Sequence, residues 1–170
     1  ITPSRVAVYV GSLRKQSFTL KIGKAFARRG PVTLKLNIVT LEGLSFFNQD
    51  LEAAPPADWV KFRETIQASD AVLFVSPEYN RGTSGVLKNA IDHASRPYGQ
   101  SAWAGKPTGV IGASGGAIGT ALAQQHLRNI LAYLDMPTLG QPEAFVQFKD
   151  GLVDAPGKLT VAATAQSLHG

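Results

Sequence analysis

Polar side chains suited to anion binding gather directly after an apolar segment at residues 5–10. Ser12, Ser17 and Thr19 offer hydroxyl groups there, and Arg14 offers a guanidinium group. Because helical periodicity begins after Ser17, the free N–H groups of a helix start would add further donors. This combination favours a phosphate pocket. A serine-rich capping turn that holds no ligand is the alternative.

The segment at residues 11–17 differs from the known triphosphate and dinucleotide patterns. It lacks the Gly-Lys-Ser/Thr ending of a P-loop, and no G-x-G-x-x-G follows the apolar segment. The tripeptide Gly105-Lys106-Pro107 leads into an expected strand instead of a helix. Gly11 is expected to allow a tight turn. We therefore expect a monophosphate held by hydroxyl and backbone N–H groups, without a lysine and Mg²⁺.

Two further loops follow apolar runs in the same way. Ser76-Pro77-Glu78-Tyr79-Asn80 comes after residues 70–75 and offers a flat ring and amide groups, which suit a planar ring system. Ser114-Gly115-Gly116 comes after residues 108–113, and its adjacent glycines let backbone N–H groups approach a ligand closely. Parallel strands bring their carboxyl ends to one edge of a sheet, so the loops are expected to line one crevice.

Alternating helical and extended patterns predict a doubly wound α/β sandwich with a five-stranded parallel sheet of order 2-1-3-4-5. Strands are expected at 5–10, 33–39, 70–75 and 108–113, with a split last strand at 137–139 and 144–148. Helices are expected at 17–29, at 57–68, from Thr83 or Ser84 to before Pro97, from about 119 to 135, and at 158–168.

Composition limits the class of protein. A chain of 170 residues with 44% hydrophobic content suits one domain over residues 1–170. It has no apolar stretch of the roughly 18 residues needed for a membrane span, and its first residues show no signal-peptide pattern, so we expect a cytoplasmic protein. Without cysteine, any redox chemistry must belong to a bound cofactor. His93 and His126 lie on expected helices without neighbours at ligand spacing, so a surface or interface position is favoured over metal binding and no metal site is expected.

The formal net charge of +5 suits an anionic ligand without identifying it. Nucleic acid is disfavoured, because the basic residues are scattered. Only Arg14-Lys15 and Arg28-Arg29 are adjacent pairs, and no aromatic residues alternate with a basic stripe.

The motifs together resemble the NAD(P)H-dependent FMN reductase family, which has a flavodoxin-like fold. The likeness covers about residues 5–148 and is closest to bacterial quinone, chromate and ferric reductases. The motifs are Gly11-Ser12-Leu13-Arg14-Lys15-x-Ser17-Phe18, Ser76-Pro77-Glu78-Tyr79-Asn80, Leu87-Lys88-Asn89-Ala90-Ile91-Asp92, Gly105-Lys106-Pro107 and Ser114-Gly115-Gly116.

This resemblance implies a bound FMN cofactor, with NADH or NADPH as the electron donor. It implies a ping-pong order in which hydride passes to FMN, and quinones, chromate or ferric complexes then take electrons from the same face. It also implies a homodimer or homotetramer.

The resemblance divides the cofactor contacts among the three loops. The FMN phosphate would be held by Ser12, Arg14, Ser17 and Thr19, with Leu13 and Phe18 in the same segment. The isoalloxazine would be lined by Pro77, Glu78, Tyr79 and Asn80. Its pyrimidine side would be flanked by Ser114, Gly115 and Gly116. Thr19 stands where the family often has Asn, which keeps a donor but shortens its reach. Arg96 ends the helix that begins beside the second loop and is a candidate contact for nicotinamide or acceptor. Its alternative is a charge that interacts with the helix macrodipole.

Two other functions fit parts of the sequence. A flavodoxin-type electron carrier would bind FMN without turning over NAD(P)H, but such carriers are usually acidic. A small serine hydrolase is the second, because Gly112-Ala113-Ser114-Gly115-Gly116 matches the G-x-S-x-G nucleophile elbow. That enzyme would need Asp150 or Asp154 together with His169, the penultimate residue.

Overall fold

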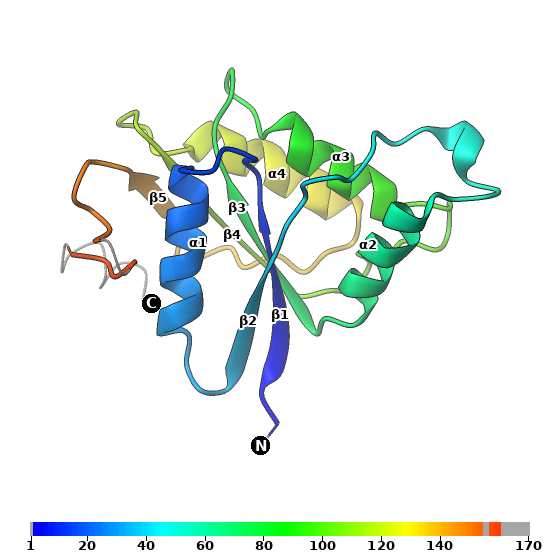
Figure 1. Ribbon diagram of the computed structural model, residues 1–170, viewed down its shortest axis with the longest axis horizontal. Coiled ribbons are helices and arrows are strands. Elements are labelled where there is room, and N and C mark those ends of the chain that lie inside the picture. Colours follow the sequence, from blue (N-terminus) through cyan, green and yellow to red (C-terminus); the bar gives the residue numbers. More distant parts are fainter. Residues whose placement is uncertain (1, 155–156, 161–170) are drawn as a thin grey trace.

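The computed structural model describes residues 2–154 and 157–160 and contains a five-stranded parallel sheet of order β2-β1-β3-β4-β5 (Figure 1). This confirms the predicted order. The strands are β1 (Ser4–Val10), β2 (Leu34–Val39), β3 (Ala71–Ser76), β4 (Thr108–Ser114) and β5 (Ala144–Gln147). The helices are α1 (Phe18–Arg29), α2 (Ala57–Gln67), α3 (Gly85–Ala94) and α4 (Ala121–Tyr133), and a 3₁₀ helix spans Gln49–Leu51.

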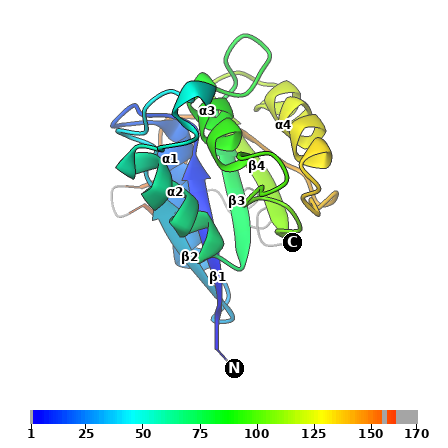
Figure 2. The same ribbon diagram turned by 90° about the vertical axis from the view of Figure 1, so that its right-hand side faces the viewer.

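Helices cover both faces of the sheet. Successive side chains of a strand point to opposite faces, and β1 is apolar on both. Val8 packs with the cluster that includes Ile22 of α1, whereas Tyr9 packs with residues of α2, α3 and α4. The two views show the same division, with α1 on one side of the sheet and α2, α3 and α4 on the other (Figures 1 and 2). The continuous apolar runs of the strands therefore reflect a sheet that is buried on both faces.

Serine side chains begin two of the helices, as expected. The Ser17 Oγ accepts a hydrogen bond from the backbone N–H of Leu20 at 3.0 Å and caps α1. The Ser84 Oγ accepts from the backbone N–H of Leu87 at 3.3 Å and caps α3, which settles the choice between Thr83 and Ser84. Within residues 2–154 and 157–160, no helix combines the length and hydropathy needed to cross a bilayer.

An aromatic cluster forms the centre of the larger core. Tyr9 lies with its ring centroid 5.7 Å from that of Phe62, 5.9 Å from Phe74 and 5.6 Å from Trp103. The Trp103 Nε1 donates to the carbonyl of Ile91 at 2.9 Å, so this buried indole is satisfied. The Tyr9 hydroxyl is buried and has no partner among the described residues. Burial raises the pKa of Tyr9 above its ordinary value.

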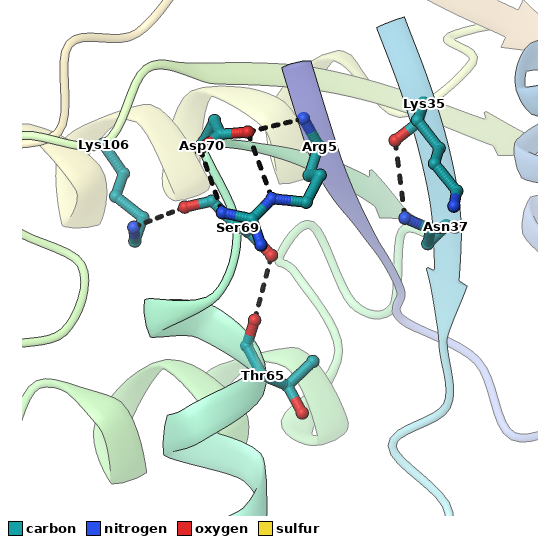
Figure 3. A network of polar contacts seen from close by, with 7 residues as sticks. All are labelled: Arg5, Lys35, Asn37, Thr65, Ser69, Asp70 and Lys106. Carbon is teal, nitrogen blue, oxygen red and sulfur yellow. Dashed lines mark hydrogen bonds and ion pairs between the residues drawn. The ribbon is translucent and has the colours of Figure 1, made fainter. Parts of the chain in front are cut away.

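Polar contacts join the amino ends of the strands (Figure 3). The Asp70 carboxylate accepts from the backbone N–H of Arg5 at 2.7 Å and from the Arg5 Nε at 3.4 Å. These hydrogen bonds and the adjacent positive charges lower the pKa of Asp70. The Lys106 Nζ donates to the carbonyl of Ser69 at 2.7 Å. These contacts connect the amino ends of β1, β3 and β4. The cavity loops lie at the opposite, carboxyl edge of the sheet.

The region after α4 follows the prediction only in part. Thr138 forms a bridge with Thr108 ahead of β5, in agreement with a split last strand. Residues 158–160 do not begin a helix, because Leu159 forms an antiparallel bridge with Val153. The remainder of the helix predicted at 158–168 lies outside the described residues.

Replacing Tyr9 with Phe should stabilise the fold. The substitution removes a buried hydroxyl without a partner and keeps the aromatic contacts, so the free energy of unfolding should rise by about 1 kcal/mol. Urea unfolding monitored by far-ultraviolet circular dichroism measures the change. Tyr133→Phe is the matched control, because Tyr133 is 85% exposed and should be neutral. A loss of stability in Tyr9→Phe would show that the hydroxyl has a partner.

Candidate cofactor site

A cavity of about 200 Å³ lies at the carboxyl edge of the sheet. It brings together residues of all three loops singled out in the sequence, so the separate motifs form one site. Its lining consists of Ser12, Arg14, Ser17, Phe18, Thr19, Pro77, Glu78, Tyr79, Ala113, Ser114 and Gly115. Ala113 was missed because the sequence placed it inside the strand.

Gly11 brings the first two loops together. A Cβ atom at Gly11 would lie 2.6 Å from the Cδ1 of Leu87 and 2.7 Å from the Cδ of Pro77. Real carbon contacts do not reach such distances, so the two segments could not approach this closely around a larger residue. The backbone N–H of Gly11 also donates to the carbonyl of Val75 at 2.9 Å. The glycine therefore serves a close approach between neighbouring strand ends.

The start of α1 lines one end of the cavity with groups suited to an anion. Ser17 and Thr19 are only 3% and 1% exposed, and their hydroxyl oxygens lie 3.4 Å apart. The N–H groups of a first helical turn have no partner within the helix, and Ser17 satisfies only that of Leu20. Buried hydroxyls and a helix start with a positive partial charge fit a phosphate group.

Arg14 is held beside this helix start. Its Nη2 donates to the carbonyl of Gln16 at 2.9 Å, and its guanidinium carbon lies 5.0 Å from the ring centroid of Phe18. Phe18 in turn stacks on Phe148, with the centroids 4.3 Å apart and the rings 12° from parallel. The aromatic support fixes the guanidinium near the cavity, where its remaining N–H groups can bind an anion.

The second loop presents Tyr79 on a tight hairpin. The backbones of Tyr79 and Gly82 exchange two hydrogen bonds of 3.0 Å each, and the residues between them, Asn80 and Arg81, have φ values of 52° and 67°. Two central residues with positive φ are typical of a type I′ turn. The Tyr79 ring is 52% exposed and lines the cavity, which suits contact with a planar ligand.

The third loop closes the opposite wall. The Ser114 carbonyl accepts from the backbone N–H of Phe148 at 2.7 Å, and the Gly115 carbonyl accepts from the Gln147 side chain at 3.4 Å. The Ser114 Oγ donates to the carbonyl of Gly116 at 3.4 Å. Within the described part of the chain, no histidine is hydrogen-bonded to Ser114. His169 lies outside the described residues, so the triad of the hydrolase alternative is not present in them.

Three predicted cofactor contacts lie outside the cavity lining. Leu13 is 54% exposed and lines a neighbouring hollow of about 210 Å³ with Ile38 and other residues of the β2 end. Asn80 occupies the hairpin turn, and Gly116 lies one residue beyond the lining.

The structure does not bring Arg96 into this cavity. Its Nε lies 2.5 Å from the Glu52 Oε1 and its Nη2 3.1 Å from the Glu52 Oε2, and this pairing raises the pKa of Arg96. Both residues line a separate cavity of about 240 Å³ together with Trp59 and His93. A helix rises about 1.5 Å per residue, so a side chain that follows α3 lies far from the loop where α3 begins.

His93 is buried in the wall of that second cavity, although the sequence favoured a surface or interface position. It is 7% exposed, and its Nε2 lies 2.7 Å from the carbonyl oxygen of Ser45. Its ring lies edge-on to Trp59, with the centroids 4.3 Å apart. Burial lowers the pKa of His93, although the Ser45 contact and the charges of Asp58 and Asp92 oppose this effect.

The sheet order and the position of the cavity define the class of protein. The chain has a flavodoxin-like sheet with a cavity at the ends of β1, β3 and β4. In proteins of this class, ligands bind at the switch point of the sheet. The chain belongs to the NADPH-dependent FMN reductase family, whose model matches residues 4–150. The resemblance inferred from the motifs is thereby confirmed.

Individual relatives agree with this family. A quinone reductase of Pseudomonas putida is 53% identical over 155 residues, which cover 91% of this chain and 83% of the relative. A 2-hydroxy-1,4-benzoquinone reductase of Burkholderia sp is 44% identical over 165 residues, with 97% and 90% covered. The solved structure of FerB, a flavoenzyme NAD(P)H:(acceptor) oxidoreductase from Paracoccus denitrificans, superposes with a TM-score of 0.94 at 42% identity, covering 98% of this chain and 92% of FerB.

The chain is therefore an oxidoreductase that uses FMN and NAD(P)H. The residues present fit this cofactor. The buried hydroxyls and Arg14 match a phosphate monoester, and Tyr79 with the glycine-containing third loop provides a slot for a flat ring. Membership of this family excludes the serine hydrolase and the flavodoxin-type carrier.

Acidification should destabilise the fold through His93. Unfolded His93 binds a proton near its ordinary pKa of about 6.5, whereas folded His93 binds it only at lower pH. Between these values the unfolded state holds more protons, so stability is complete above this window and falls as pH decreases through it. Urea unfolding at several pH values measures the slope for the wild type and for His93→Gln, which keeps an N–H donor for Ser45. Equal slopes in the two proteins would contradict this role for His93.

Proposed function

We propose that this enzyme reduces quinones with electrons from NADH or NADPH, using FMN held in the cavity at the carboxyl edge of the sheet. The observation that carries the proposal is the convergence of Ser17, Thr19, Arg14 and Tyr79 on one cavity. The relatives from Pseudomonas putida and Burkholderia sp, which carry quinone reductase names, support the choice of acceptor. Bound FMN would supply the hydride chemistry, so the proposal requires no side-chain nucleophile.

Different loops would hold different parts of FMN. The phosphate would be neutralised and oriented by Ser12, Ser17, Thr19 and Arg14. The Phe18 ring packs against the Arg14 guanidinium group and supports it. Pro77, Glu78, Tyr79 and Asn80 belong to the loop that would line one side of the ring system, and Ser114, Gly115 and Gly116 to the loop beside its pyrimidine edge. Because Tyr79 is half exposed, the donor and the acceptor could reach the same open face in turn.

The proposal extends to other acceptors, to the extent of the domain, to the compartment and to the oligomeric state. We infer that chromate and ferric complexes can replace quinones, that residues 1–170 form one domain, and that the enzyme works in the cytoplasm. A homodimer or homotetramer is supported by apolar side chains exposed on the cavity loops, namely Leu13, Tyr79 and Ile118, which are 54%, 52% and 50% exposed.

An absorption spectrum tests the proposal first. The purified, desalted protein, incubated with FMN and desalted again if colourless, should show flavin bands near ~370 and ~450 nm that bleach on anaerobic addition of NADH or NADPH. A quinone added afterwards should restore the bands. A protein that retains no FMN would refute the site, and bleaching that no quinone reverses would refute the proposed acceptor.

Replacing Arg14 with Ala should weaken FMN binding. The variant loses charge-assisted hydrogen bonds to the phosphate, and the dissociation constant should rise about 10- to 100-fold. Fluorescence titration of the apoprotein with FMN measures this change. Lys15→Ala is the matched control, because it removes the same charge from the same loop but not from the cavity lining. An equal effect in both variants would show that the loop acts only through its net charge.

A further inference from the structure

Helix α4 begins without a cap from its own residues. Thr120 occupies the N-cap position, is fully buried and makes no side-chain capping bond. Its Oγ1 instead accepts a hydrogen bond from the Gln124 Nε2 at 3.0 Å. Its φ of 131° is unusual for a β-branched residue. The first N–H groups of α4 therefore need an acceptor from elsewhere in the chain.

Glu78 provides that acceptor from the second cavity loop. Its Oε2 accepts hydrogen bonds from the backbone N–H groups of Leu122 and Ala123, both at 3.1 Å. A carboxylate at a helix start also interacts favourably with the macrodipole. The Glu78 carboxylate thus joins the loop after β3 to the helix after β4.

His126 makes a second connection one turn further along α4. Its Nδ1 accepts a hydrogen bond from the backbone N–H of Thr83 at 3.3 Å, so a neutral His126 carries its proton on Nε2. Gly82 permits this approach, because a Cβ atom there would lie 3.1 Å from the Nδ1. Residues three and four positions apart share one face of a helix, so His126 lies on the same face of α4 as Leu122 and Ala123, whose N–H groups Glu78 binds.

The hairpin that carries Tyr79 lies between these two connections. Glu78 immediately precedes it and Thr83 immediately follows it. Asn80 and Arg81 at its turn adopt positive φ, a conformation that L-residues rarely hold without support. Both views show this loop projecting beyond the edge of the sheet near the start of α4 (Figures 1 and 2).

We propose that Glu78 and His126 are positioning residues that clamp both ends of the Tyr79 hairpin to α4 and so hold Tyr79 in place for FMN. The inference rests on the proposed function, because it takes the cavity as the FMN site. The Glu78 carboxylate acts through its hydrogen bonds to the start of α4. The same helix follows the Ser114–Gly119 loop, so the clamp also fixes the spacing between the second and third cavity loops.

Four substitutions separate the clamp from general stability. Glu78→Ala and His126→Ala each remove one connection. His126→Asn keeps an acceptor, since the asparagine Oδ1 can take the place of Nδ1, and Glu78→Gln keeps a carbonyl oxygen but loses the charge. Gln125→Ala is the matched control, because this neighbouring side chain on α4 is exposed.

The first measurement is backbone amide hydrogen exchange in the FMN-free protein. His126→Ala should speed exchange of the Thr83 amide about tenfold, and Glu78→Ala should do the same for the Leu122 and Ala123 amides, because each amide loses its acceptor. His126→Asn should restore the wild-type rate at Thr83.

The second measurement is FMN titration, in which either alanine variant should raise the dissociation constant about fivefold to tenfold. His126→Asn, Gln125→Ala and the wild type should bind FMN alike, and Glu78→Gln should fall between Glu78→Ala and the wild type.

The outcomes distinguish the clamp from the proposed function. If the wild type binds FMN and the alanine variants bind it equally well despite faster exchange, the connections are structural only and the clamp is overturned. Unchanged exchange at Thr83, Leu122 and Ala123 would overturn it as well. If His126→Asn weakens FMN binding as much as His126→Ala, the hydrogen bond is not the cause. A wild type that fails to bind FMN would instead refute the proposed function, whatever the exchange rates show.

Discussion

The site depends on the absence of a side chain at Gly11. β1 and β3 are neighbours in the sheet, and Val10 and Val75 stand opposite each other at their ends. Beyond this pair, the backbone of Gly11 lies against Pro77 and Leu87 with no room for a Cβ atom. A larger residue would push the first loop away from the second. The hydroxyls at the start of α1 and the Tyr79 ring would then no longer share one cavity.

Most of the positive φ values at non-glycine residues occur near the same edge of the sheet. Among the described residues there are four, of which Asn80, Arg81 and Thr120 belong to segments that form or join the cavity loops, whereas Asp135 follows α4. Such conformations persist only where neighbouring structure determines them. The aromatic cluster around Trp103 packs in the larger core, and the polar contacts join the amino ends of the strands, so both support the sheet that carries these loops.

The sequence predicted the parts of the structure that depend on local pattern. Apolar runs located all five strands, and Ser17 and Ser84 marked helix starts, because capping requires only neighbouring residues. The three loops were found because parallel strands end at one edge. Contacts over long sequence separations were not predictable. Glu78 lines the cavity, but nothing in the sequence indicated that its carboxylate accepts hydrogen bonds from a helix 44 residues away. His93 was expected at the surface or at an interface, but it is buried, and its partner Ser45 lies 48 residues earlier.

The distribution of polar groups indicates where specificity arises in this enzyme. Because a flavin carries its own reactivity, the protein needs to hold the cofactor and expose one face. In the proposed site, the buried hydroxyls and the Tyr79 hairpin would serve the first task, and neither depends on which acceptor arrives. Selection among acceptors must then come from the rim, where Leu13, Tyr79 and Ile118 expose apolar surface on three different loops.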